Sequence, residues 1–503
     1  MLCSPTVAAF ICVLLLYLIV SKVRSHAQLK HIPGPAIAGW TDGWLMRHTL
    51  GGRLPFTLKD AHKEHGRLVR VAPNWVVCGD GTELRRLWAA RSPWKRAPWY
   101  RGLRFDPWRD STFSAVDDKF HDHLRSKVAA GYAGKDVDGV QDAIDEQVAG
   151  LVNLLETKYL SSDDSSNGGG CFRPVDLARK VQFFTLDVIS SIGFGKKFGY
   201  LDADADAFRY IEITETLIPT LLVMTLQTWI LDILQSPVVK YLAPDSRGAI
   251  GIGEVMSRAQ EAVKERYGPD AVRRRDILGS FVAHGLIMEE AEGETVVQIL
   301  AGSDTTATAI RATMLFIMTN PGVYARLREE IDKAAAEGHI SSPITDAEAR
   351  KMPYLQAIIR EGIRYWPPAT GLLPKVCDKD ELVWGVRIPA GTNVGWSPFA
   401  VMRDVEVFGP DAEVFRPERW IGVSPDKYRS MEAIVMLDFA GGSRWECLGR
   451  NIAMMELNKV FVELWRRFDF AIVNPTKPWL CENYAVWIQK ELNVKVTRRA
   501  FPV

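Results

Sequence analysis

The chain has few cysteines and almost no net charge. Seven cysteines stand at positions 3, 12, 78, 171, 377, 447 and 481 of 503 residues, with no CxxC pair and no His/Cys cluster at zinc spacing. This usage argues against a disulfide scaffold and indicates a reducing compartment. The 62 basic and 61 acidic residues give a formal net charge of +1, so no bulk electrostatic attraction draws the chain to nucleic acid.

Several common catalytic and nucleotide-binding motifs are also missing. The sequence has no Walker A pattern, no GxSxG elbow and no HExxH motif, and the glycine pairs at 193–199 and 248–253 lack the continuation of a dinucleotide-binding fingerprint. ATP, bound nicotinamide, serine hydrolysis and zincin chemistry therefore have no support. With 47% hydrophobic and 24% charged residues the composition is that of an ordinary globular protein.

The N-terminal end carries an uncharged apolar run. TVAAFICVLLLYLIV, with the residues before it, is long enough to cross a bilayer as a helix, and it has neither a basic segment in front nor a cleavage site behind. We therefore expect a retained transmembrane anchor over residues 1–21. Lys22, Arg24 and Lys30 follow and predict that the rest of the chain lies on the cytosolic side.

Proline residues separate this anchor from the main body. His31 to Pro35 read HIPGP, which forbids helix continuation, so we expect a basic flank and Pro-rich hinge over residues 22–36. No composition break follows. We expect residues 37–503 to form one mostly helical domain with a minor β portion, and the apolar stretch 207–243, interrupted at Pro219 and Pro237, to form a helix pair on the core or the membrane surface.

Cys447 lies between glycines and a helical pattern, in FAGGSRWECLGRNIAMMELNKVF (439–461). A helix N-terminus presents free N–H groups and a positive dipole end, both of which favour a thiolate, and the glycines let backbone amides fold around a sulfur. Such a cysteine suits metal ligation or nucleophilic attack. The alternative is an inert cysteine buried at a helix end.

A second candidate lies in a long apolar helical pattern, EGETVVQILAGSDTTATAIRATMLFIMT (292–319). The polar cluster from Ser303 to Thr306 competes with the helical hydrogen bonds, so we expect a distorted turn. Ala301 and Thr305, four residues apart, share a face that could line a cavity. The alternative is a helix that starts at Ser303 with these residues as its cap.

A third candidate is the pair Glu361 and Arg364, three residues apart on an apolar helical pattern that Pro367 and Pro368 end. A charge pair buried there needs a further partner, and Arg419 in FRPERW (415–420) is the candidate. The same ExxR spacing occurs at residues 83/86 and 463/466, where we expect solvated pairs.

In this order, the anchor, the Pro-Gly-Pro hinge, AGSDTT, ExxR, FRPERW and the cysteine loop resemble the cytochrome P-450 family, in its membrane-anchored eukaryotic type and fungal secondary-metabolism group. The resemblance implies the cytochrome P-450 fold, a mainly α single domain. It implies haem b as cofactor, with Cys447 as the axial thiolate ligand of the iron. It also implies that Asp304 and Thr305 are catalytic and deliver protons to dioxygen, and that Glu361, Arg364 and Arg419 form a charge network supporting the cysteine loop.

The resemblance implies further contacts. His121 and Arg125, in HDHLR, together with Arg444, would bind the haem propionates, and Phe439 would contact the haem. Substrate contacts would come from loops near 99–112 and 484–487 and from Leu300, Ala301, Thr370, Leu372 and Leu373.

The cysteine loop departs from the family pattern. The family usually has phenylalanine seven residues and glycine four residues before the cysteine, where this chain has Ala440 and Ser443. Phe439 and Gly442 each lie one residue early, so the loop carries one extra residue ahead of Arg444 and Trp445, and the haem contact of Phe439 is in doubt.

The expected activity is that of a haem-thiolate monooxygenase inserting one oxygen atom from O2 into a hydrophobic small molecule, a secondary-metabolite intermediate. Because only some 50 residues follow the cysteine loop, too few for a flavin domain, electrons from NADPH would come through a separate reductase in the endoplasmic reticulum membrane, with cytochrome b5 as a further candidate partner. Two alternatives stay open: a haem-thiolate isomerase or dehydratase that needs no reductase, against which Thr305 argues, and a non-catalytic membrane haem binder.

Overall fold

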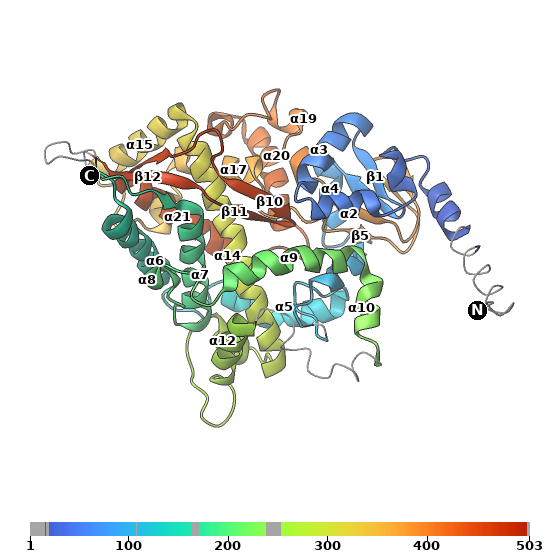
Figure 1. The fold of residues 1–503 in the computed structure, drawn as a ribbon, viewed down its shortest axis with the longest axis horizontal. Helices are drawn as coiled ribbons and strands as arrows, with labels where there is room; N and C mark the ends of the chain where they lie inside the picture. Colours follow the sequence, from blue (N-terminus) through green and yellow to red (C-terminus); the bar gives the residue numbers. More distant parts are fainter. Residues whose placement is uncertain (1–15, 17–19, 107, 163–170, 238–252, 500–503) are drawn as a thin grey trace, which may run out of the picture.

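A computed structural model describes residues 16, 20–106, 108–162, 171–237 and 253–499, and these form a largely helical body around one long helix, α14 (Met288–Met318) (Figure 1). The helices described ahead of it are η1 (Ala36–Gly39), α2 (Gly43–Leu50), α3 (Leu54–His65), α4 (Gly81–Trp88), η2 (Pro98–Leu103), α5 (Asp118–Tyr132), α6 (Val140–Leu154) with its π-helical end η3 (Leu155–Tyr159), α7 (Leu177–Phe194), α8 (Tyr200–Ala203), α9 (Tyr210–Leu226), α10 (Thr228–Leu234), α12 (Gly253–Lys264) and α13 (Ile277–Ala283). Those after it are α15 (Pro321–Ala336), α16 (Asp346–Ala349), α17 (Pro353–Tyr365), α18 (Pro398–Val401), α19 (Val405–Phe408), η6 (Pro417–Trp420), α20 (Pro425–Val435), η7 (Met436–Phe439) and α21 (Arg450–Arg467).

The strands make a minor portion of the fold. The largest sheet has the order β1 (Leu68–Ala72), β2 (Trp75–Cys78), β8 (Asn393–Trp396), β5 (Lys375–Val376) and β3 (Lys95–Arg96), and in it β2 and β8 run parallel. A three-stranded sheet orders β4 (Val175–Asp176), β12 (Asn493–Arg498) and β9 (Phe468–Ile472), and two hairpins pair β6 (Glu381–Val383) with β7 (Val386–Ile388) and β10 (Leu480–Tyr484) with β11 (Val486–Lys490). The predicted fold class, mainly helical with a small β portion, is confirmed.

Helix α14 forms the centre of the core, because buried side chains, mostly apolar but including polar ones such as Gln298 and Arg311, lie around most of its circumference. It packs against α7, α12, α17 and α21. The helix runs without interruption through Ser303 to Thr306, so the predicted distorted turn is wrong, and so is the alternative of a helix start at Ser303. Ser303 and Asp304 have hydrogen-bond partners in neighbouring helices, and the Thr305 hydroxyl bonds back to α14 itself.

A second, smaller core lies between the N-terminal sheet and α9. Val69 and Val77 of the sheet, Trp99 of η2, Leu222 of α9 and Leu372 pack together there. This cluster joins the β portion to the helical body, and it places the turn after α17 beside α9.

The predicted anchor, residues 1–21, falls almost entirely outside the described residues. The basic flank begins with a helical run over residues 20–28, and the hinge lies against the sheet, because the carbonyl of Pro33 accepts the N–H of Arg70 at 2.8 Å. Within the described part of the chain no single helix is long and apolar enough to span a bilayer; α9 and α10 meet those criteria only as a pair, bent by 99°.

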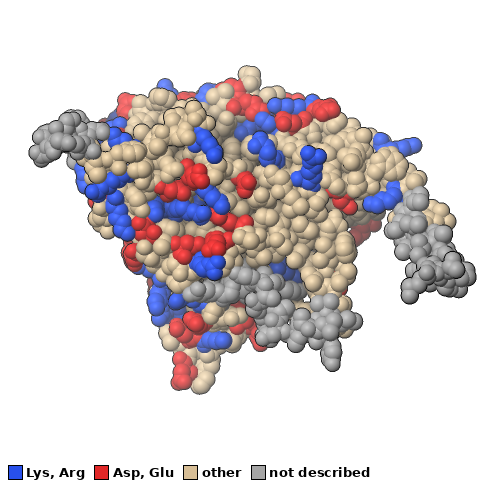
Figure 2. All heavy atoms as spheres, viewed as in Figure 1, with Lys and Arg blue, Asp and Glu red and all other residues tan. Residues whose placement is uncertain are grey.

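The expected helix pair at 207–243 is present as α9 and α10, but its break differs from the prediction. Pro219 lies inside α9, and the chain turns instead at Gln227 (φ −121°, ψ 64°). The surface over α9 and α10 carries few charged side chains, whereas lysine, arginine, aspartate and glutamate mix elsewhere on the same face (Figure 2).

Candidate active site

The cysteine loop closes on its own backbone. The 3-10 helix η7 ends at Phe439, and the chain reverses through left-handed conformations at Ala440 (φ 51°) and Gly442 (φ 77°). The N–H of Cys447 then donates to the carbonyl of Phe439 at 2.8 Å, and α21 begins at Arg450. The loop therefore holds the sulfur next to the start of α21. Phe439 itself is half-buried, and its predicted haem contact stays a prediction.

The thiol of Cys447 is accessible but lies within the fold. Its side chain has exposed surface, yet burial raises the pKa of the thiol, against the opposing effects of the Gly449 N–H and the nearby Arg450 and Arg125. The Gly449 N–H at the helix start lowers the pKa as expected, but desolvation outweighs it in the protein alone. A metal ion at the sulfur would reverse this balance, because a coordinating thiol is deprotonated outright.

Basic side chains surround Trp445, the residue two positions before this cysteine, and two of them, Arg96 and Lys375, are buried cations. Arg96 and Lys375 stand directly opposite each other in the β3–β5 pair, where like charges are unfavourable. Arg125 and His121, from α5, complete the group. The half-buried Arg125 guanidinium donates to the Glu446 carbonyl at 2.8 Å, whereas burial lowers the pKa of His121 to about 4, so this ring, 3.2 Å from the Asp122 carboxylate, is neutral near pH 7. Among the described residues no carboxylate forms an ion pair with Arg96, Arg125 or Lys375.

Burial is costly for these cations. It lowers the pKa of Arg96 to about 10 and that of Lys375 to about 7. The Nε of Arg96 is buried without a hydrogen-bond partner. Unpaired buried cations carry a large desolvation cost that an anionic ligand can offset. The donor set therefore fits a ligand with carboxylate groups beside Cys447. No local sequence signal identifies Arg96 and Lys375 as site residues. They face each other only because two strands of two residues each pair in the fold.

Arg444 does not lie in this cluster. Its guanidinium lies 3.3 Å from Asp118 and 3.2 Å from Asp122, on α5, and is partly exposed. The side chain that enters the cluster is that of Trp445, whose ring lies 3.7 Å from the His121 ring and 3.8 Å from the Arg96 guanidinium carbon. The propionate contact expected for Arg444 stays a prediction, and the ion pairs show only that its guanidinium lies against α5. His121 is buried, and its propionate contact stays a prediction.

The polar cluster of α14 divides between two sides of the helix. The Thr305 hydroxyl donates to the Ala301 carbonyl at 2.7 Å, and Ala301 is exposed although it lies midway along the central helix. The Asp304 carboxylate faces α7 and α9 instead, where it accepts from the Gln182 amide at 2.5 Å and the Tyr210 hydroxyl at 3.1 Å.

The protonation of Asp304 depends on these neighbours. Burial raises the pKa of Asp304 to about 6, while the charge of Arg311 and the Tyr210 hydrogen bond oppose that rise. Arg311 belongs to the same network, because its guanidinium donates to the Gln182 side-chain oxygen at 2.8 Å. A carboxyl group with such a pKa can hold or release a proton near neutral pH. No hydrogen bond among the described residues joins Asp304 directly to Thr305.

Glu361 is the centre of a fully buried network. Its carboxylate accepts from Arg364 at 2.7 and 2.8 Å and from Arg419 at 3.0 Å. The Arg416 N–H and the Trp420 indole donate as well, at 2.8 and 3.0 Å. The structure thus brings Glu361, Arg364 and Arg419 together.

The other two ExxR pairs differ from each other. Glu83 and Arg86 form a partly exposed pair, as expected. Glu463 and Arg466 are buried, so the expectation of a solvated pair was wrong there.

The predicted substrate residues fall into two groups. Thr370 and Leu372 line a cavity of about 20 Å³, the size of a single water, together with Trp99 and with Leu222 and Leu226 of α9. Leu300 and Ala301 lie on α14 and do not line it, and Leu373 is half-buried with a positive φ of 42°.

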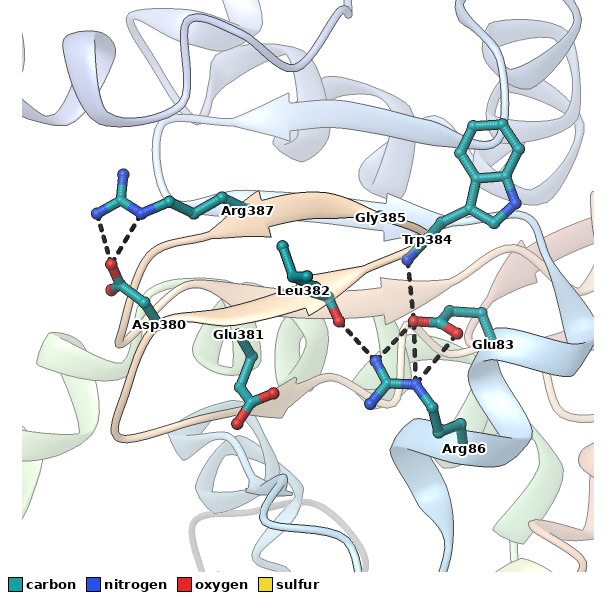
Figure 3. A pocket seen from close by; sticks show the side chains of 8 residues that line it. All are labelled: Glu83, Arg86, Asp380, Glu381, Leu382, Trp384, Gly385 and Arg387. Atoms are coloured by element: carbon teal, nitrogen blue, oxygen red, sulfur yellow. Dashed lines mark hydrogen bonds and ion pairs between the residues drawn. The ribbon is translucent and has the colours of Figure 1, made fainter.

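A larger pocket, of about 540 Å³, is not the candidate site. It lies between α4 and the β6–β7 hairpin, and its charges are already paired, Glu83 with Arg86 at 2.6 Å and Asp380 with Arg387 at 2.5 Å (Figure 3). None of its lining residues comes from α14 or the cysteine loop.

Known proteins resemble this chain along most of its length. The sequence model of the family described as Cytochrome P-450 matches residues 96–497, a span that contains every site residue above. Cytochrome P-450 monooxygenase ABA1 of Pyricularia oryzae is 39% identical over 493 residues, covering 96% of this chain and 95% of that protein. Cytochrome P-450 monooxygenase aba1 of Botryotinia fuckeliana is 37% identical, and the alignment covers 93% of this chain and 92% of that protein. Cytochrome P-450 monooxygenase abl1 of Leptosphaeria maculans is 35% identical, with 93% of this chain and 83% of that protein covered.

Proposed function

Because the chain belongs to the cytochrome P-450 monooxygenase family, we propose that it binds haem b through the Cys447 thiolate and inserts one oxygen atom from O2 into a hydrophobic small molecule. The observation that carries this proposal is an accessible internal thiol next to Arg96 and Lys375, two buried cations without a carboxylate partner in the described part of the chain. Haem offers both missing parts, an iron for the sulfur and carboxylates for the cations.

The residues around the site fit this cofactor. Among the described residues no cluster of three or more His, Cys, Asp or Glu side chains could hold a bare metal ion. A metal bound by Cys447 alone among protein side chains must take its other ligands from elsewhere, as the iron of a macrocycle does. When bound, haem supplies dioxygen activation, and a thiolate ligand pushes electron density that favours O–O cleavage.

The protein side chains would supply position and protons. Arg96, Lys375, His121 and Arg125 would hold the carboxylate end of the cofactor. The Thr305 hydroxyl, bonded to the Ala301 carbonyl, can rotate to pass a proton toward the space that Ala301 faces. Asp304, with its pKa near 6, holds a proton one position away along α14, and releases it after its bonds to Gln182 and Tyr210 rearrange.

The substrate is a hydrophobic molecule, and we propose a secondary-metabolite intermediate. The small cavity between α9, Trp99 and the Thr370–Leu372 turn supports this, because its lining includes no charged side chain. A cavity of one water's size must widen to admit such a molecule, and α9 is the element that forms its outer wall.

We further propose a single-pass anchor in the endoplasmic reticulum membrane with the catalytic domain in the cytosol. The apolar run before Lys22 supports it, and so do the exposed side chains of Trp229 and Ile233 on α10 and of Trp40 after η1. An NADPH-dependent reductase would deliver the electrons, with cytochrome b5 as a second candidate donor. This places the chain beside its reductase in one membrane.

Turnover with defined components tests the proposal. Purified full-length protein in vesicles, with reductase, NADPH and 18O2, should form a product that carries one labelled oxygen atom, and Cys447→Ala should form none. A product that appears without NADPH or reductase would favour the isomerase or dehydratase alternative. Haem binding without any product across a panel of hydrophobic substrates would favour the non-catalytic one.

A further inference from the structure

The position two residues before Cys447 is occupied by Trp445, and its indole lies among the buried cations. The guanidinium carbon of Arg96 lies 3.8 Å from the centre of the Trp445 ring and 4.1 Å from that of Tyr100, so the cation is held between two aromatic faces. The Lys375 ammonium lies 5.3 Å from the Trp445 ring, and the His121 ring lies 3.7 Å away. Trp445 thus contacts three of the four members of the cluster.

Arg96 is held in place from a second direction. Its Nη1 donates to the carbonyls of Thr112, Phe113 and Ala115 at 3.3, 2.7 and 3.1 Å. These bonds fix one end of the guanidinium, and the aromatic faces fix its plane. The Nε atom is left without a partner. Cation–π attraction is strongest with tryptophan and grows when the cation is desolvated, as Arg96 is.

Arg444 has the opposite orientation. It pairs with Asp118 and Asp122 on the partly exposed side of α5, so its charge is already neutralised. Arg444 therefore fastens the loop to α5 from outside, whereas the side chain of the next residue, Trp445, enters the cation cluster.

We propose that Trp445 is the positioning residue for the carboxylate groups of the cofactor: it orients Arg96 and His121 toward them, and Arg444 takes no part. This rests on the proposed binding of haem. The retention of haem, rather than the ligation of its iron, is then what Trp445 controls.

The test compares haem release from purified full-length holoprotein of the wild type and of Trp445→Leu, Trp445→Phe and Arg444→Gln, using excess apomyoglobin as acceptor. Trp445→Leu should release haem about tenfold faster, a factor equal to about 1.4 kcal/mol, while Trp445→Phe, which keeps an aromatic face, should show a smaller change. Arg444→Gln should stay within about twofold, the range expected for a partly exposed ion pair.

A double-mutant cycle separates positioning from a general loss of packing. If Trp445 acts through Arg96, Trp445→Leu should add little to the release rate in an Arg96→Gln background, since coupled neighbours are not additive. The proposal would be overturned if Trp445→Phe and Trp445→Leu both released haem at the wild-type rate. It would also be overturned if Arg444→Gln released haem faster than either of them. A wild-type protein without a thiolate-haem spectrum would instead refute the proposed function, so the two failures are distinguishable.

Discussion

Replacing Glu361 by glutamine should be among the most destabilising single changes in the chain. The carboxylate is fully buried and accepts five hydrogen bonds, four of them from side chains of two arginines and a tryptophan. A glutamine of the same size can accept at one of its two positions only, and it leaves Arg364 and Arg419 buried without an anion. Breaking a buried ion pair by removing one partner costs about 3–5 kcal/mol.

This loss of stability should appear as a lower melting temperature. With an unfolding entropy of about 2.1 cal/mol/K per residue, a chain of 503 residues loses about 1 °C of Tm for each kcal/mol, so Glu361→Gln should unfold about 3–5 °C earlier. Circular dichroism at one fixed scan rate measures this difference. Burial raises the pKa of Glu361, but the charge of Arg364 and the hydrogen bonds to the carboxylate outweigh it and hold the pKa below its usual value. The stability difference between wild type and Glu361→Gln should therefore be full at neutral pH and should shrink as pH falls below 4.5.

The matched control is Glu83→Gln. Glu83 and Arg86 have the same spacing and a contact of 2.6 Å, but on a partly exposed helix, where such a pair contributes about 1 kcal/mol or less. Equal losses of Tm in the two variants would refute the reasoning that burial and the additional donors, rather than the charge pair, set the energy at Glu361.

Three further outcomes follow from other sites. Tyr210→Phe removes a donor that lowers the pKa of Asp304, so the pH at which turnover falls as this proton donor ionises should move upward; an unchanged alkaline limb of the pH–rate profile would mean that Asp304 does not titrate in turnover. Burial raises the pKa of Glu294 from 4.5 to about 7, so ionising this carboxyl destabilises the fold as pH rises through that range. Relative to wild type, Glu294→Gln should gain up to about 3 kcal/mol of unfolding free energy between pH 5 and pH 8, measured by thermal unfolding. A difference that stays constant with pH would contradict this. Thr305→Val removes the hydroxyl that bonds to Ala301, so more NADPH should be spent on peroxide than on product, and tight coupling in that variant would argue against proton transfer by Thr305.

The large helical features could be predicted from the sequence because local signals agree with the fold. The apolar pattern of 292–319 lies within α14, and the prolines after residue 365 follow the end of α17, where a buried charge pair was expected and is found. These features depend on periodicity and on residue types that end helices, both of which act over a few neighbouring residues.

What escaped prediction depends on pairing between distant segments. Arg96 and Lys375 face each other only because two short strands, 279 positions apart, come together. The buried state of Glu463 and the unbroken course of α14 at Ser303 likewise depend on neighbours in space, since tertiary packing overrides local preference. That the side chain of Trp445 enters the cation cluster while Arg444 pairs with α5 likewise depends on contacts with distant segments.

The central claim is that Cys447 is the protein ligand of a haem iron, and the carbon monoxide difference spectrum of the reduced full-length protein tests it most directly. The account predicts the strongly red-shifted Soret band of a thiolate-ligated haem, and its loss in Cys447→Ser. A Soret band at the position found for histidine-ligated haem, or a red-shifted band that survives the loss of Cys447, would contradict it.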